Sequence, residues 1–195
     1  AEAPMVMDIT YRGDYGTSLR RQIGAIPPDQ LETMMKAQWE GGESGTTIDS
    51  VETRYDEPAN ALHFILRGTT RLSWVNGPAG RVMAMPESAL TLPASAERRG
   101  VLAAFANHPY AIGHPIMNRS VARIALPYEG RGFALEGGDQ VLEGGGYRVE
   151  RRAVLADGVA EIVVTTTSLA PEVTAEEMAA MRTRAENASA LPLRL

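Results

Sequence analysis

The sequence predicts a mainly β protein of the α+β class: antiparallel sheets packed like a β-sandwich, a helical pair in the first half and one helix at the C-terminus. Three observations lead to this prediction. Runs of alternating apolar and polar residues recur along the chain, as in residues 119–127. Two β-rich runs flank the dipeptide Asp157–Gly158, which favours a tight hairpin. Helical spacing is confined to the stretch after residue 17 and to the end of the chain.

A strand and two helices are predicted first. Residues 5–11 have the pattern of a strand, and Thr17 or Ser18 can cap the helix that follows. Two prolines end that helix, and the second, Pro28, suits the first turn of the next helix, where its missing N–H costs nothing. We expect this second helix to end at Gly41–Gly42. Its apolar stripe could line a flexible binding groove, but core packing is the simpler interpretation: Leu31, Met34, Met35 and Gln38 or Trp39.

Two strands and a short hairpin complete the first half. Residues 46–55 and 61–68 are β-rich, and the turn-forming sequence DEPAN joins them. Alternation puts Leu62, Phe64 and Leu66 on one face of the second strand. The sequence NGPAG predicts a further hairpin between RLSWV and RVMAM. Residues 86–100 are rich in Pro, Ser and Ala, so we place a boundary there. It separates residues 1–90 from residues 91–195, as two subdomains or one continuous domain.

The Asp157–Gly158 turn fixes the register of the clearest predicted hairpin, because both turn positions need positive φ. The register pairs Ala156 with Val159, Val154 with Glu161 and Arg152 with Val163. One face is then apolar: Tyr147, Val149, Ala153, Leu155, Ile162 and Val164. The other is polar and belongs to a sheet with one wet side. Arg151 falls on the apolar face, so we expect it to lie near a sheet edge or to have a carboxylate partner.

The chain is predicted to close with a helix. Thr174 and Glu177 have the spacing of a capping box, and Val173 and Met178 have that of a hydrophobic staple. The apolar stripe of this helix is narrow: Met178, Met181 and Ala185.

Composition excludes several classes of function. The chain has no cysteine, which excludes disulfides, thiolate nucleophiles and Cys-based zinc sites. Its net charge of −5 argues against binding to nucleic acid, which usually needs a basic face. No apolar stretch approaches the length of a membrane span. The paired arginines alternate with acidic residues and are interpreted as solvated: Arg20–Arg21, Arg98–Arg99 and Arg151–Arg152.

No catalytic motif is complete. The sequence Gly42-Glu43-Ser44-Gly45 is one residue short of a hydrolase elbow. The glycine clusters at 137–138 and 144–146 precede strands rather than a helix, so they predict hairpin loops and not a phosphate site. Asp139 and Glu143 are expected to be solvated rather than to form an acid–base pair. We therefore predict no catalytic residue and no cofactor.

His108 and His114, in the stretch NHPYAIGHP, are the remaining candidates for a metal or catalytic site. Two such histidines can bind zinc with a third ligand from elsewhere, but the specific spacing His-Glu-x-x-His is missing. Each precedes a proline, which favours extended backbone. The simpler interpretation is a stiff connector whose histidine rings pack against a sheet, so we predict no metal site here.

Part of the sequence resembles a known family. The segment NHPYAIGHPIMNRSVARIALPYEGRGFALEG is similar to a C-terminal segment of bacterial transglutaminase-like proteins, in which β-rich domains of unknown function flank a papain-like core. The matching residues are Pro109, Tyr110, Pro115 and the run ALPYEG, where one extra residue before Gly130 departs from the family pattern. The Asp157–Gly158 hairpin, the ending TAEEMAAMR and the early stretch YGTSLRRQIGAIPPDQLETMM also resemble the family, so the resemblance covers most of the chain.

The resemblance implies a function without catalysis in this chain. The family core uses a Cys–His–Asp triad, and this chain has no cysteine, so the resemblance implies the region after the core. We expect a non-catalytic accessory region that supports or positions the core of the same parent chain, or its substrate. Relatives are typically exported, which implies the periplasm or the cell surface.

Two other functions stay open. The first is a stand-alone periplasmic module that binds peptide or glycan through exposed aromatic side chains on a sheet face, such as Trp39, Trp74 or Tyr147. The second is a metal-dependent enzyme centred on His108 and His114.

Overall fold

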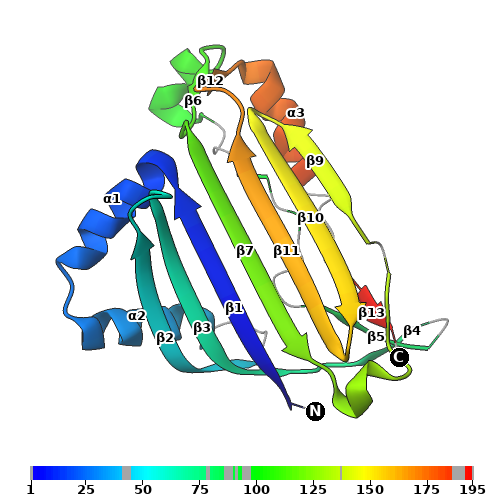
Figure 1. Cartoon of the computed structure of the whole chain (residues 1–195). Coiled ribbons are helices and arrows are strands. Elements are labelled where there is room, and N and C mark those ends of the chain that lie inside the picture. The colour runs from blue at the N-terminus through cyan, green and yellow to red at the C-terminus, as the bar shows by residue number, and fades with distance from the viewer. Residues whose placement is uncertain are drawn as a thin grey trace.

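A seven-stranded antiparallel sheet forms the body of the computed structural model, in the order β2-β3-β1-β7-β11-β10-β9 (Figure 1). The structure describes residues 2–40, 45–77, 80–85, 90, 92–93, 98–136, 138–185 and 192–194. The strands of this sheet are β1 (Glu2–Arg12), β2 (Thr46–Asp56), β3 (Ala61–Arg71), β7 (Ile116–Ala125), β9 (Gln140–Gly144), β10 (Tyr147–Ala156) and β11 (Val159–Ser168).

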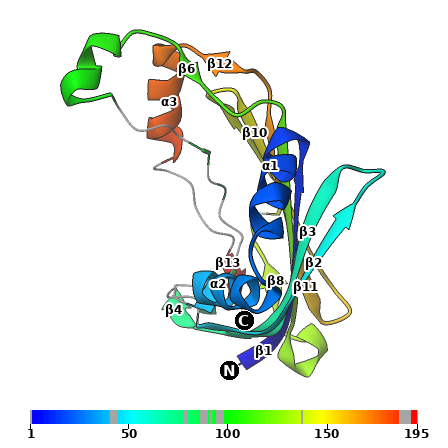
Figure 2. The same cartoon turned by 90° about the vertical axis from the view of Figure 1, so that its left-hand side faces the viewer.

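Helices and small sheets cover one face of the large sheet. The helices are α1 (Gly13–Gly24), α2 (Pro28–Glu40) and α3 (Ala175–Ala185), with 3₁₀ turns η1 (Gly100–Phe105) and η2 (Pro127–Gly130). The short strands are β4 (Val75–Gly77), β5 (Gly80–Ala84), β6 (Tyr110–Ala111), β8 (Ala134–Leu135), β12 (Glu172–Val173) and β13 (Pro192–Arg194). Figure 2 shows the three helices and β4 on one side of the large sheet, which we call the inner face; the opposite side is the outer face. The predicted mainly β fold with a helical pair and a C-terminal helix is confirmed.

The N-terminal strand lies near the centre of the sheet. β1 pairs with β3 on one side and with β7 on the other, so strands from the first and second halves of the chain are direct neighbours. The boundary placed near residue 90 therefore does not divide this sheet. The predicted strand end at Gly68 was too early, because β3 continues to Arg71 beside β1 and β2.

The apolar core lies on the inner face. Leu62, Phe64 and Leu66 are 2% exposed or less, as their alternation predicts. They pack with the apolar side chains of β1, β7 and β11 in one cluster, and α1 and α2 cover it through Leu19, Ile23, Met35 and Trp39. A second cluster lies under α3: Leu90, Leu92, Tyr110, Tyr147, Val149, Val173, Met178 and Met181.

The hairpin at Asp157–Gly158 has the predicted register. Asp157 and Gly158 have φ of 50° and 74°, and Ala156 pairs with Val159. Arg151 is 2% exposed on the inner face, and its Nη2 donates to Gln140 Oε1 at 2.7 Å. Gln140 is on the edge strand β9, so Arg151 lies next to a sheet edge, as expected. Burial lowers the pKa of its guanidinium.

The two helices of the first half differ from expectation in detail. α1 begins at Gly13 rather than at Thr17 or Ser18, because Gly13 turns the chain at a φ of 72°. A Cβ at Gly13 would lie 2.4 Å from the carbonyl oxygen of Pro115, a contact that the local sequence does not reveal. In α2, Leu31, Met35 and Trp39 are partly buried, but Met34 is 57% exposed, so its assignment to the stripe was wrong. The end predicted at Gly41–Gly42 lies outside the described residues.

The capping box at α3 is confirmed. The backbone N–H of Thr174 donates to Glu177 Oε2 at 2.8 Å, and the N–H of Glu177 donates to Thr174 Oγ1 at 3.1 Å. Val173 and Met178 are both buried in the second cluster, as the predicted staple requires. Met181 is buried as well, and the side chain of Ala185 lies outside the described residues.

Replacing Thr174 by alanine is expected to cost about 1 kcal/mol of unfolding free energy, as for other N-cap hydroxyls. Thr174 donates to Glu177 from its N–H and its hydroxyl, and both bonds lower the pKa of that carboxyl. A carboxyl with a lowered folded-state pKa stabilises the fold above its unfolded-state pKa, and this contribution is lost as the pH falls through the folded-state value. Thermal melting should therefore show the difference between wild type and Thr174→Ala shrinking on acidification. A difference that stays constant down to about pH 3 would contradict the role of Glu177.

Candidate functional site

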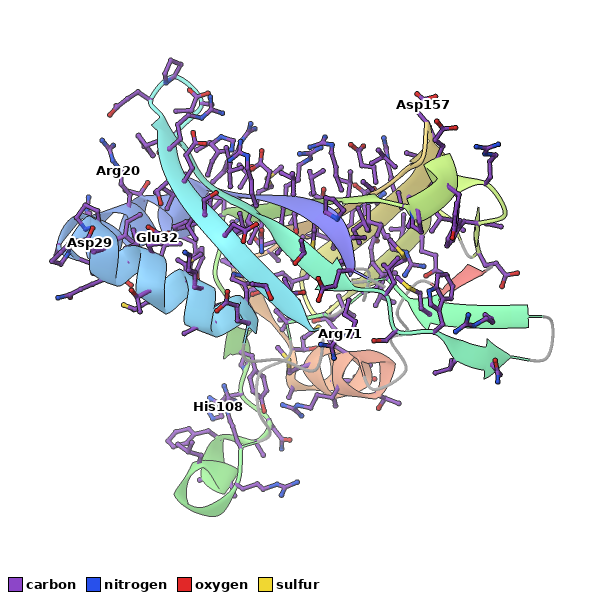
Figure 3. All side chains as sticks on the ribbon, turned by 90° about the horizontal axis from the view of Figure 1, so that it is seen from below. Arg20, Asp29, Glu32, Arg71, His108 and Asp157 are labelled. Carbon is purple, nitrogen blue, oxygen red and sulfur yellow. The ribbon has the colours of Figure 1, made fainter. Side chains whose placement is uncertain are left out.

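The two candidate histidines lie on either side of the short strand β6 and have different partners. His108 is exposed beside η1, away from the large sheet (Figure 3), and its ring packs edge-on against Phe105 with 5.4 Å between centroids. His114 Nδ1 lies 3.1 Å from Ser168 Oγ on β11. Within the described residues, no group of three or more His, Asp and Glu side chains could hold a metal ion. His114 is exposed and contacts β11 through this one ring nitrogen, while His108 contacts Phe105 of η1.

Arg98 holds the turn that contains His108. Its Nη1 donates to the carbonyl oxygens of Phe105 at 2.5 Å and His108 at 2.6 Å, and its Nη2 donates to that of Pro109 at 2.8 Å. The guanidinium also lies over the ring of Tyr110, 3.8 Å from the centroid. The prediction that Arg98 is merely solvated was wrong, because a planar guanidinium can hold several carbonyls and stack on an aromatic ring at once.

Arg98→Lys is expected to loosen residues 105–110. A lysine ammonium cannot span three carbonyl groups and also stack on Tyr110, and charged hydrogen bonds contribute about 1.5–3 kcal/mol. Hydrogen exchange should become faster in residues 105–110 and stay unchanged in β10 and β11. The matched control is Arg152→Lys, at an arginine with no described ion pair. Unchanged exchange in Arg98→Lys would show that the loop is held by other contacts.

The third histidine, His63, lies on the outer face beside Asp8 and Thr10. Its Nδ1 is 3.1 Å from Thr10 Oγ1 and 3.4 Å from Asp8 Oδ1. In a catalytic hydroxyl–His–carboxylate relay, the hydroxyl and the carboxylate face different ring nitrogens. Here one nitrogen faces both groups, and Thr10 is only 5% exposed. The cluster therefore ties β1 to β3, and we assign it no catalysis.

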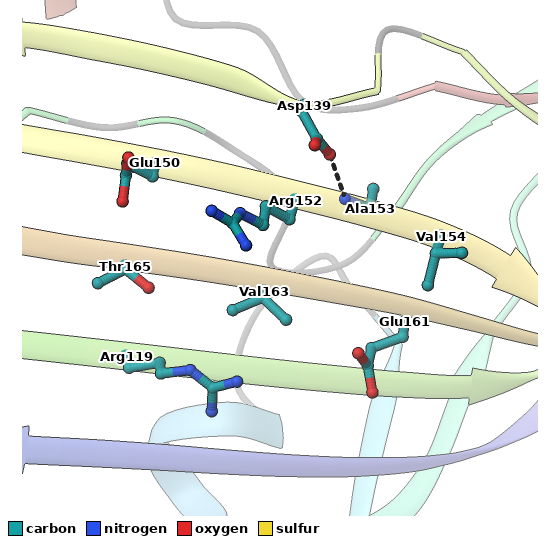
Figure 4. A pocket seen from close by; sticks show the side chains of 9 residues that line it. All are labelled: Arg119, Asp139, Glu150, Arg152, Ala153, Val154, Glu161, Val163 and Thr165. Atoms are coloured by element: carbon teal, nitrogen blue, oxygen red, sulfur yellow. Dashed lines mark hydrogen bonds between the residues drawn. The ribbon is translucent and has the colours of Figure 1, made fainter.

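A shallow hollow of about 610 Å³ lies on the outer face over β7, β10 and β11. Figure 4 shows Arg152 on β10 and Arg119 on β7, on either side of Val163 on β11. Val154, which is 51% exposed, borders the same hollow. The hollow thus combines two guanidinium groups with an aliphatic floor.

The carboxylates near this hollow are already engaged. Glu161 forms an ion pair with Arg123 at 2.7 Å, and Arg148 binds both Glu143 and Glu150. Asp139 Oδ1 accepts a hydrogen bond from the backbone N–H of Ala153 at 3.3 Å. Asp139 and Glu143 are both exposed, as expected, and each also has a polar partner.

Arg119 and Arg152 are the guanidinium groups that remain available in the hollow. Among the residues that the structure describes, neither has a carboxylate within 4.0 Å. Two cations over a half-exposed apolar floor suit the carboxylates of a binding partner. This hollow is the candidate functional site.

The aromatic residues named for glycan binding do not lie on an open sheet face. Trp39 is on α2 and packs against the core, and Trp74 packs against Phe133 with 5.5 Å between ring centroids. Tyr147 is 6% exposed on the inner face, and burial raises the pKa of its hydroxyl. The stacking surface expected from Trp39, Trp74 and Tyr147 is therefore not formed, because core packing uses these rings.

The glycine clusters have structural roles where they are described. Gly145 and Gly146 form the turn between β9 and β10 with φ of 54° and 77°. A Cβ at Gly146 would lie 2.4 Å from Ile112 Cδ1, so the turn packs closely against the core. Gly137 and residues 42–44 lie outside the described portion of the chain.

The sequence alone predicts only part of this hollow. The Asp157–Gly158 register places Arg152 and Val163 side by side on the polar face, and the structure confirms this pair. Arg119 joins them through the pairing of β7 with β11, which opposes Arg119 to Thr165. No local signal connects residues 119 and 165.

Comparisons of the chain with models of protein families, with curated proteins and with solved structures find no match. Within the portion of the chain that the structure describes, no helix is long and apolar enough to cross a membrane. The geometry of the outer face is thus the main evidence on function. There, Arg119 and Arg152 face outward over Val163.

Proposed function

We propose that this chain is a non-catalytic accessory region of an exported transglutaminase-like protein, where it supports or positions the core of the same parent chain or its substrate. The observation that carries the proposal is the hollow on the outer face, with Arg119 and Arg152 available over Val163. We propose that this face meets an acidic surface of the core or of the substrate.

The chemistry of the outer face fits such a contact. Its charged side chains are largely paired, as in Arg123–Glu161 and Arg67–Glu52, and aliphatic side chains are interspersed. Contacts between domains are of this mixed kind, more polar than a permanent interface. Arginine is favoured at their centres because its planar fork binds carboxylates in two-pronged geometry.

The identity of the partner is supported by the sequence resemblance. The segment that carries it, residues 107–137, includes His108 and Pro109, which Arg98 bonds, and the whole of β7. β7 contributes Arg119 to the hollow, so the segment that resembles the family also helps to form the proposed contact face.

The test is charge reversal in the full parent protein. Arg119→Glu with Arg152→Glu is expected to lower turnover of a protein-bound glutamine substrate by about tenfold, which corresponds to about 1.4 kcal/mol of lost contact. The matched control is Arg81→Glu with Arg131→Glu, two exposed positions away from the hollow. Equal turnover in the two double variants, with unchanged melting temperatures, would overturn the proposal.

The alternative function is a stand-alone periplasmic module, and we retain it only as a module that binds peptides, not glycans. The glycan version depended on Trp39, Trp74 and Tyr147, which pack into the core. The peptide version is favoured by a groove beside the edge strand β2.

A further inference from the structure

Strand β2 forms a long edge of the large sheet, and side chains of α2 bond the backbone of its first half. Lys36 Nζ of α2 donates to the carbonyl oxygen of Asp49 at 2.9 Å, and Glu40 Oε1 accepts from the N–H of Ile48 at 2.8 Å. A β-bulge between Ile48 and Ser50 adds to this protection. These are the usual means by which a protein prevents another strand from pairing with an edge.

In the part of the chain that the structure describes, no side chain of a helix bonds the backbone of the second half of β2. From residue 51 to residue 56, the outward backbone groups make no hydrogen bond to another described residue. Every second residue of an edge strand turns its N–H and C=O outward, so about three residues are open to pairing over this stretch. By contrast, the opposite edge strand, β9, is only five residues long.

A groove of about 540 Å³ adjoins this open edge on the inner side. Its apolar lining comes from the helical pair and from β2 itself: Ile23, Ile26, Leu31 and Val51. Figure 1 shows that α1 and α2 extend beyond β2 on the side away from β3. An added strand would therefore have the helical pair beneath its inward side chains.

From this edge and this groove together, we propose that residues 51–56 of β2 bind an extended peptide segment as an eighth strand of the sheet. Main-chain hydrogen bonds to the edge give affinity, and alternate aliphatic side chains of the peptide enter the groove beside Val51 and Leu31. The open edge can pair with a strand, and the groove can accept apolar side chains at every second position of that strand. Both observations therefore favour an extended peptide with alternating apolar residues.

The charge at the rim of the groove adds a requirement on the sequence of the bound peptide. Asp29 lies at the exposed start of α2 on the rim of the groove (Figure 3), and its carboxylate has no ion pair among the described residues. Glu32, by contrast, is paired with Lys36 at 2.9 Å. We therefore assign a basic residue to the end of the bound segment. A second copy of this chain fits less well, since each copy carries a net charge of −5.

This inference does not depend on the proposed accessory role, because the β2 edge and the outer hollow share no residue. The probe is a fluorescein-labelled peptide of the sequence KVTVTVK, titrated with the chain and followed by fluorescence anisotropy. Saturable binding is expected, with amide shifts in ¹⁵N-labelled chain confined to β2 and to the turn between α1 and α2.

Two controls separate strand addition from other modes. Thr53→Lys puts a charge in the groove at an exposed position and should weaken the peptide at least about tenfold. Thr47→Lys, exposed on the protected half of the same strand, should leave the affinity unchanged. Two further peptides of the same sequence carry N-methyl groups on alternate backbone nitrogens, one at the odd positions and the other at the even positions. At least one of them should not bind, because the N–H groups that would face the edge of β2 are blocked.

Each other result overturns the proposal. Equal binding by both N-methylated peptides would mean that the groove binds side chains without strand pairing. Absence of peptide binding, with a dimer in sedimentation equilibrium that Thr53→Lys dissociates, would assign the edge to a second copy. Amide shifts on the outer face instead of β2 would place the peptide in the hollow of Arg119 and Arg152.

Discussion

Replacing Gly68 by alanine is expected to destabilise the fold by about 3 kcal/mol or more, the upper end of the cost of overpacking. A Cβ at Gly68 would lie 1.9 Å from the carbonyl oxygen of Thr47 and 3.0 Å from Ile48 Cα. These are backbone atoms of β2 next to its bulge, so they cannot move aside as the end of a side chain can. Glycine inside a strand often marks such a close backbone approach.

The matched control for Gly68→Ala is Gly24→Ala at the end of α1. A Cβ there would meet nothing within 4 Å, so alanine should be neutral or stabilise by up to about 1 kcal/mol. Urea unfolding followed by circular dichroism measures both changes. Equal stability of the two variants would show that β2 can shift away from β3 without loss.

Ile162→Ala is expected to cost about 2–5 kcal/mol of unfolding free energy, as for other large-to-small substitutions in a core. Ile162 is 1% exposed on the inner face of β11, between Ala122 on β7 and Ala153 on β10. Both strand neighbours at this level are alanines, so they cannot fill the space that the larger side chain leaves.

The matched control for Ile162→Ala is Val163→Ala, one residue further along β11. Val163 points to the outer face and is only partly buried, so its truncation should cost less than half as much. Chemical denaturation of the Ile162→Ala and Val163→Ala variants gives their losses of unfolding free energy, and so compares the inner and outer faces of one strand. A larger cost for Val163→Ala would reverse the assignment of inner and outer faces.

Local sequence signals predict a structural feature correctly where the contacts that determine it lie between residues close in the sequence. The hairpin register follows from Asp157–Gly158 alone, because the two left-handed residues permit one tight turn. The capping box at Thr174 and Glu177 spans a single helical turn. The start of α2 at Pro28 follows in the same way from the fixed φ of proline.

Features that depend on distant segments of the chain were missed. At the early start of α1, Gly13 lies close to Pro115, and β3 continues past Gly68 by pairing with β1 and β2. The sequence also does not show that β1 lies between β3 and β7. Alternation identifies which residues share a face, but it does not identify neighbouring strands.

The same distinction applies to the candidate site. Alternation placed Arg152 on a wet face, while only the pairing of β7 with β11 brings Arg119 to the same hollow. His108 and His114 stand out as a motif in the sequence, yet Arg98 makes the interactions that hold the turn around His108. Arg98 is ten residues before His108, and no motif links the two.

The central claim is that this chain works as the accessory region of a transglutaminase-like protein. The most direct measurement is peptide mapping, by mass spectrometry, of the polypeptide that an antibody to this chain precipitates from the source cells. The claim predicts one continuous polypeptide that also contains a core with Cys, His and Asp. A polypeptide of 21.0 kDa, with no sequence beyond this chain, would contradict it.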